Sequence, residues 1–505
     1  MIPTSDTYRP FPALRRVGVG VKFGLVDLTA KPGASFSVSE KGALPFGGRT
    51  INNVYSPGGK YASLEPNIWR LDSTFDILPD DAAAVETGWW TDTYSGEDGT
   101  FAAPPWIRYD FAAPVSTIGW SLFFDDKAGQ YATAVRATSY DASGAEMDVF
   151  EFSCESAVAY IQHELEGYSA VKFEFLSTSE PFRRVRLAEV DFGLAEVWDA
   201  DRVGSVSLTA GADILAASFP AREVRFTFDN SDMVFDLFDP EGLYVYLRDG
   251  QEVEVSLVIG GESVYMGAFS FTSASVESTP ITPTIQADDI VLRLDGELYG
   301  PGNDGITTLS AAVSAVLGDT SVPLFYADGV ADRAVRNSVP ENTTKREALR
   351  MLAQAAMVSV FTDRYGTIRF VPLDVGEPVG ELTPDELYDY TGISISPPVD
   401  RVELTSAPIE GDKAVYTAGD GKQVSSFSNP CVAPSAGADV AAWLLAGSNR
   451  RKRYSVRNRC DPAVDIGDTI RIHDIYKRAG AAVVTSYEIT FGTGGLSALT
   501  GGVGT

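Results

Sequence analysis

Short runs in which apolar and polar residues alternate recur along most of this 505-residue chain. The runs end at Gly, Pro, Asn or Asp, and alternation with a period of two is typical of half-buried antiparallel strands. Side chains two positions apart lie on the same face of a strand, so each run can supply one apolar side of a sheet. The clearest runs are VKFEFL at 171–176, VRFTF at 224–228, VEVSLVI at 253–259 and TIRIH at 469–473. The sequence therefore predicts a mainly β protein, and a chain of this length should contain about three or four domains.

Three stretches have helical spacing instead, at 305–318, 344–357 and 438–447. The second has the strongest signal, because Thr344 and Glu347 form a capping-box pattern before an apolar stripe that includes Leu352. Two alternating runs follow it directly and meet around 363–366, where turn residues favour a hairpin. The sequence predicts a helix packed on a hairpin in this region.

Composition and charge exclude several classes of function. With 40 Lys and Arg against 69 Asp and Glu, the net charge is −29, which repels nucleic-acid phosphates and anionic membranes. No apolar stretch reaches about 18 residues and the N-terminus has no signal-peptide pattern, so we expect neither membrane insertion nor ordinary export. Three distant cysteines predict no disulfide framework. Two histidines, with no hydrolase, zinc or nucleotide motif, predict that the chain is not an enzyme.

The segment 60–195 resembles the discoidin-type β-sandwich of the coagulation factor 5/8 C family. The resemblance rests on GWWTDTYSGEDG at 88–99, PPWIRYDF at 104–111 and FRRVRLAEVDFG at 182–193. It implies a jelly roll of antiparallel strands whose loops at one end bind ligand. The two cysteines that often join the ends of such domains are absent, since only Cys154 lies in the segment.

Aromatic and acidic residues near the first of these motifs are the candidate ligand-binding residues. Aromatic side chains on a rim can stack on sugar rings, and at most one of the neighbouring Trp89 and Trp90 can be free to do so. The acidic loop at 92–99 offers oxygen ligands of the kind that Ca²⁺ prefers. The alternative is an ordinary acidic turn. The main expectation is that the chain binds no metal and no cofactor. The candidate residues are Trp69, Trp90, Asp92, Tyr94 and Asp98.

The remainder of the chain resembles the tail-tip or baseplate hub proteins of long-tailed bacteriophages and prophages. Four segments carry this resemblance in the same order, at 224–255, 343–372, 450–472 and 487–504. It implies two tail-tube-like β-barrels with small α/β parts. The expected domains are the first strands of barrel one at 1–50, the sandwich at 51–196, the rest of barrel one at 197–300, a helix–hairpin domain at 301–380, and barrel two at 381–505 with a helix at 438–447 and an extended C-terminal tail.

The hub resemblance implies a structural role at the distal end of a phage or phage-derived tail. The chain would be a homotrimer in the virion tail tip, made in the host bacterial cytoplasm. Its partners would be the distal tail protein, the tape measure protein and the tip or receptor-binding proteins, with DNA passing through the lumen and the sandwich contacting host-surface glycans. The alternatives are a carbohydrate-binding adhesion module and a tail-associated cell-wall hydrolase.

Two charged segments suggest further hypotheses about the hub role. Residues 201–300 contain five Arg, no Lys and 17 Asp and Glu, a net charge of −12 that suits a lumen which must not retain DNA. A solvated acidic face is the alternative. The basic run at 450–459 is expected to pair with an acidic neighbouring subunit rather than to bind phosphate. The proposed lumen residues are Asp229, Asp232, Asp236 and Asp239.

Overall fold

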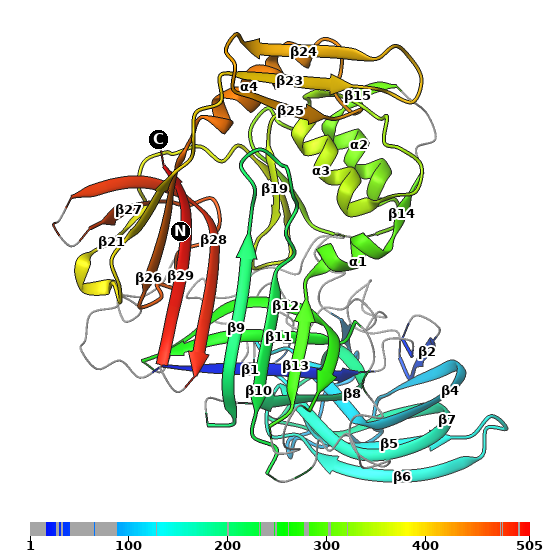
Figure 1. Ribbon diagram of the computed structural model, residues 1–505. Coiled ribbons are helices and arrows are strands. Elements are labelled where there is room, and N and C mark those ends of the chain that lie inside the picture. Colours follow the sequence, from blue (N-terminus) through cyan, green and yellow to red (C-terminus); the bar gives the residue numbers. More distant parts are fainter. Residues whose placement is uncertain are drawn as a thin grey trace. The chain divides into compact units, whose positions relative to one another are not determined.

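The computed structural model is mainly β with several sheets and few helices, which confirms the predicted fold class (Figure 1). Two compact units divide the chain: an inserted unit of Phe23–Glu196 with Leu243–Gln251, and a main unit of Met1–Lys22, Val197–Gly242 and Glu252–Thr505. The structure describes residues 17–26, 30–31, 34–40, 65, 88–127, 129–198, 201–231, 233, 247, 250–260, 262–276, 282–300, 305–320, 322–474, 476, 478–492 and 495–504.

The inserted unit is built around two long strands that each take part in two antiparallel ladders. Residues 106–110 of β4 pair with 170–174 of β7, and this ladder is extended by β2 on one side and by β5 and β6 on the other. Residues 119–123 of β4 pair with 158–162 of β7, and β8 and β3 extend that second ladder. The strands are β2 (Ser35–Val38), β3 (Trp89–Trp90), β4 (Trp106–Phe124), β5 (Ala132–Tyr140), β6 (Glu146–Ser153), β7 (Val158–Thr178) and β8 (Arg186–Trp198).

The change of ladder along β4 depends on Gly119. Its φ is 155°, and a side chain there would overlap the carbonyl oxygen of Ile161, with only 2.0 Å between that oxygen and a Cβ. The two ladders enclose an aromatic core in which Trp120 packs edge-on against Phe173, with 5.4 Å between the ring centres. Further core residues are Leu122, Phe124, Val135, Phe175, Val190 and Phe192.

The main unit contains two groups of strands that share one long strand. The first group has the order β11-β12-β13-β10-β9, and the second joins β21, β27, β28, β29, β26 and β22. The strands of the first are β9 (Val203–Gly211), β10 (Glu223–Phe228), β11 (Glu252–Ile259), β12 (Glu262–Ser275) and β13 (Thr284–Asp288), and β1 (Val17–Val26) pairs with β11. Those of the second are β21 (Gly380–Leu382), β22 (Gly392–Ile395), β26 (Lys452–Asn458), β27 (Thr469–His473), β28 (Ala479–Gly492) and β29 (Gly495–Gly504).

The shared strand is β28, which runs beside β9 in Figure 1. Its first part, Ala479–Val483, pairs with β27, and its last part, Ser486–Phe491, pairs with Val206–Gly211 of β9. A register shift between Val484 and Ser486 separates the two parts. Backbone hydrogen bonds therefore join the two groups of strands directly, without an intervening linker.

The first three helices follow β13 in the sequence, and each of them begins at a side chain that caps its N-terminus. The Thr344 hydroxyl accepts a bond from the Glu347 N–H at 3.2 Å, which confirms the predicted N-cap, whereas the Glu347 carboxylate pairs with Arg350 instead of closing the capping box. Thr308 and Asp289 cap the other two helices. These helices are α1 (Ile290–Gly296), α2 (Leu309–Leu317) and α3 (Lys345–Ala355). The helices predicted at 305–318 and 344–357 are confirmed, whereas α1 was not predicted.

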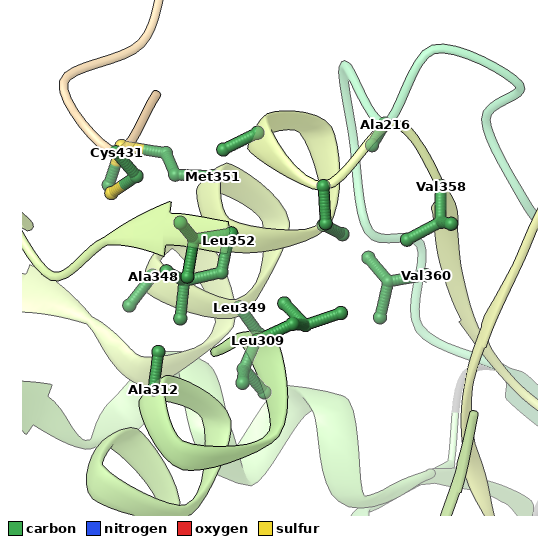
Figure 2. Close-up of a cluster of buried hydrophobic side chains, with 14 of the residues drawn as sticks. Ala216, Leu309, Ala312, Ala348, Leu349, Met351, Leu352, Val358, Val360 and Cys431 are labelled. Carbon is green, nitrogen blue, oxygen red and sulfur yellow. The ribbon is translucent and has the colours of Figure 1, made fainter. Parts of the chain in front are cut away.

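The predicted hairpin after α3 is also confirmed, and helices and hairpin share one core (Figure 2). Strands β19 (Ser359–Thr362) and β20 (Ile368–Val371) pair antiparallel, and β16 (Leu324–Tyr326) adds parallel to β20. Short pairs link β14 (Leu298–Tyr299) to β18 (Thr343–Thr344) and β15 (Ile306–Thr308) to β17 (Ala334–Arg336). Fully buried members of this core include Leu309, Leu349, Leu352 and Val360.

A last layer follows the hairpin in the sequence. Strands β23 (Arg401–Ser406), β24 (Ala414–Gly419) and β25 (Val424–Ser428) form one sheet, and α4 (Gly437–Ser448) packs on β23 and β24. This helix confirms the one predicted at 438–447. A short 3₁₀ turn, η4, spans Pro384–Glu386. No helix in the described ranges has the length and apolarity needed to cross a bilayer.

Candidate functional site

The two neighbouring tryptophans at the predicted ligand rim are both buried. Trp89 and Trp90 form β3, and neither indole is exposed to solvent. The guanidinium of Arg186 lies over the Trp90 ring, 3.9 Å from its centre, in a cation–π contact. The prediction that Trp90 stacks on a sugar is therefore wrong, because a buried arginine takes the face that a sugar would need. Trp69 lies outside the described residues.

Arg186 is held in the interior by carboxylates on two other segments. Its side chain is fully buried, forms an ion pair with Asp125 at 2.9 Å and a second ion pair with Glu65. Glu65 also accepts a bond from the backbone N–H of Arg184 at 2.8 Å. A buried cation is tolerated only when paired, so these carboxylates explain how the arginine can lie beneath Trp90.

Tyr94 is half-buried, and a second arginine covers one face of its ring. The Arg184 guanidinium lies 4.1 Å from the ring centre, and one of its nitrogens is 2.5 Å from the Tyr94 hydroxyl. The same guanidinium donates to the carbonyl oxygens of Thr91 and Asp92 at 2.5 and 2.7 Å. The structure thus brings Trp90, Asp92 and Tyr94 together, but as a loop braced by arginines rather than as an open platform.

The acidic residues of this loop are exposed, and the contacts of Asp92 and Asp98 are with protein groups. Asp98 accepts bonds from the N–H and the hydroxyl of Thr100 at 3.0 and 2.7 Å, and these bonds lower the pKa of its carboxyl. The carboxylate of Asp92 lies 3.7 Å from Arg184. Across the described part of the chain, no three His, Cys, Asp or Glu side chains gather as a metal site would require. The loop has the geometry of an acidic turn.

The main unit contains a second charged feature, which we call the arginine joint and which consists of Arg222 and Arg364. Arg222 precedes β10, is fully buried, and donates to the carbonyl oxygen of Asp363 at 3.1 Å and to that of Met266 at 2.5 Å. It also donates to the Tyr487 hydroxyl at 3.5 Å. Burial alone would lower the pKa of this guanidinium, but Tyr487 and nearby carboxylates outweigh it and raise the pKa.

Arg364 completes the joint from the turn between β19 and β20. Its guanidinium pairs with Asp465 at 3.0 Å and donates to the carbonyl oxygens of Pro462, Val464 and Tyr265 at 2.9, 3.2 and 3.3 Å. The planar fork of arginine suits such a set of acceptors. The two arginines therefore bind the hairpin turn to both groups of strands of the main unit.

Close packing around the joint leaves no space for a side chain at Gly267, and a buried carboxyl, Asp289, lies at the start of the helix that follows β13. A Cβ at Gly267, whose φ is 147°, would lie 2.8 Å from the Arg222 guanidinium. The Asp289 carboxyl caps α1 and accepts a bond from the Thr362 hydroxyl of the hairpin. Burial raises the pKa of Asp289. Sequence reasoning missed both arginines, and the only signal was a charged residue in the hairpin turn TDRYGT at 362–367.

Of the four residues proposed to face a lumen, the described part of the chain includes Asp229. Its carboxylate is exposed and accepts a bond from the Ser231 N–H at 2.9 Å. Asp232, Asp236 and Asp239 lie outside the described residues. The lumen hypothesis thus stays a prediction.

The structure resembles several solved tail proteins. The 43 kDa tail protein of prophage MuSo2 from Shewanella oneidensis aligns over 61% of this chain and 94% of its own, with 15% identity and a TM-score of 0.44. A tail protein from Neisseria meningitidis aligns over 61% and 93%, with 12% identity and a TM-score of 0.46. An Escherichia coli type VI secretion component, described as similar to phage tail proteins, aligns over 60% and 74%, with 10% identity and a TM-score of 0.37. No protein-family model and no curated protein matches the sequence.

Proposed function

We propose that this protein is a structural hub at the distal end of a long-tailed phage or phage-derived tail, where three copies join the tail tube to the tip. The order of the sequence motifs suggested this role. The observation that carries the proposal is the continuous strand β28, which pairs with both groups of strands of the main unit. A hub must transmit force without bending between its parts, and strand pairing across the two groups gives that rigidity.

The arginine joint supports the same role. Arg222 and Arg364 bind the hairpin turn to both groups of strands through buried hydrogen bonds, and neither guanidinium is open to a substrate. A buried, hydrogen-bonded polar network rigidifies a fold. The proposal therefore assigns no catalysis to the chain. It also assigns no glycan contact to Trp90, which is buried, or to Tyr94, which is half-buried with Arg184 on one face of its ring.

An exposed edge of the main unit is the surface that we assign to contact between copies. In the described part of the chain, β22 pairs only with β26. The side chains of Ile393 and Ile395 are 53% and 63% exposed, and Tyr390 just before them is 76% exposed. An exposed apolar edge strand is a template for pairing with another chain, and natural proteins normally cover it.

Charge complementarity favours a second copy of this chain as the partner that covers this edge. On β26, Lys452 lies opposite Ile395 and Arg453 opposite Ser394, so cations flank the apolar strip. The whole chain carries −29, and its segment 201–300 carries −12. A basic edge on one copy and acidic surface on the next make a head-to-tail contact, which closes into a ring.

Replacing Ile395 by Asp should break this ring. Sedimentation velocity should show the wild-type chain as a trimer and Ile395→Asp shifted towards monomer, because the change puts an anion into an apolar, acid-facing contact. Val415→Asp on β24 is the matched control, since Val415 is 56% exposed and belongs to another sheet. A trimer that survives Ile395→Asp would exclude this edge, and a monomeric wild type would contradict the trimer itself.

A further inference from the structure

A lysine is buried between two carboxylates in the inserted unit. Lys31 is only 8% exposed, and its Nζ lies 3.1 Å from Oε1 of Glu189 and in contact with Oδ1 of Asp191. Glu189 and Asp191 are two positions apart on β8, so both carboxyl groups lie on one face of that strand. Chain segments about 160 residues apart thus bring an amine and two acids together.

The cluster is closed off from water. The two acids are 0% and 5% exposed, Glu189 lies opposite the buried Phe123 of β4, and Ala30 beside the lysine belongs to the buried core of the unit. Burial raises the pKa of the Glu189 carboxyl, and the neighbouring Lys31 only partly opposes that effect. The raised pKa favours the protonated form of Glu189, which can give a proton to a neighbouring group.

We propose that Lys31 and Asp191 join autocatalytically through an amide bond between their side chains, with Glu189 as the proton carrier. The reaction needs no cofactor or second substrate. A desolvated lysine is a competent nucleophile, and fixed proximity replaces the activation that an amide bond otherwise requires. The proposal is independent of the hub function, since it concerns only the inserted unit.

The step balances within the three side chains. A proton passes from the Lys31 ammonium to the Asp191 carboxylate, which leaves a neutral amine and a neutral acid. The amine lone pair then attacks Cγ of Asp191 and forms the C–N bond. Glu189 takes a proton from the nitrogen and gives one to the departing hydroxyl, and the C–O bond breaks to release water. The sum is an ammonium plus a carboxylate giving an amide plus one water, with no change of oxidation state.

A second lysine–carboxylate pair of the same unit lacks the burial that the reaction requires. Lys172 and Glu174 form an ion pair at 3.2 Å, but their side chains are 24% and 19% exposed. Water reaches both side chains, so the amine and the acid are not held together in a closed, desolvated site. This pair provides the matched control.

Intact mass spectrometry of the purified full chain, after denaturation, tests the proposal. The wild type should be lighter than its sequence by about 18 Da, the mass of one water. Lys31→Arg should restore the full sequence mass, because a guanidinium keeps the positive charge but does not acylate. Lys172→Arg should keep the deficit. After trypsin, fragment 23–41 should be found covalently joined to fragment 187–202.

A further variant tests the role of Glu189. Glu189→Gln keeps the size of the side chain but cannot carry the proton, so a large fraction of this variant should have the full sequence mass. A wild type at full mass would overturn the proposal. A deficit that persists in Lys31→Arg would also overturn it, since it would show that water is lost elsewhere, for example by cyclisation of an aspartate.

Discussion

Replacing Arg364 by Ala should destabilise the main unit by about 3–5 kcal/mol, the usual loss when one partner of a buried ion pair is removed. The change would leave Asp465 without its cation and the carbonyl oxygens of Pro462 and Val464 without their donor. Unsatisfied buried acceptors add to the loss. Arg364→Lys should be intermediate, because it keeps the charge but loses the planar fork.

Urea titration followed by circular dichroism, together with calorimetry, measures this effect as a shift of the transition midpoint. Arg293→Ala is the control, because Arg293 forms an exposed pair with Glu297 on α1, and its side chain is 71% exposed. Surface pairs of this kind contribute at most about 1 kcal/mol. If Arg364→Ala unfolded at the wild-type midpoint, the arginine joint would not hold the main unit together.

Replacing Leu352 by Asp should cost about 4 kcal/mol or more, because it removes a fully buried side chain and introduces a carboxyl into its place. Leu352 lies on α3 with Ala348 and Leu349, in the core shared by helices and hairpin (Figure 2). The effect is measured by urea titration followed by circular dichroism, as for Arg364→Ala. The matched control is Leu298→Asp. Leu298 is 62% exposed, so this substitution should lower the free energy of unfolding by less than about 0.5 kcal/mol.

The penalty at Leu352 should also depend on pH. A carboxyl in this core has a folded-state pKa raised above its unfolded value, so it is tolerated better when protonated. The variant should therefore lose stability relative to the wild type as pH rises from about 4 through the raised pKa. Wild-type stability for Leu352→Asp at neutral pH would contradict the placement of this helix.

The elements that sequence reasoning located are those with strong local signals. Alternation located the strands, and the Thr344 cap with its apolar stripe located α3 and the hairpin after it. Helix α1 escaped prediction because it is only seven residues long. Seven residues give too few turns for a helical period to stand out.

The rim residues show why side-chain roles were harder to predict than elements. The motif at 88–99 indicated a loop beside a strand, and the structure has one. Whether Trp90 faces solvent depends on Arg186, Glu65 and Asp125, which come from three distant parts of the chain. The same holds for Lys31 and Asp191, whose meeting only the folded sheet creates. Pairing over such distances leaves no local pattern in one sequence.

The most direct test of the hub proposal is gold labelling of negatively stained particles from an induced or infected culture, with an antibody raised against residues 50–196. The proposal predicts label at one end of the tail and none along the tube or on the head. Label on cell surfaces and never on particles would contradict the hub function and favour an adhesion module.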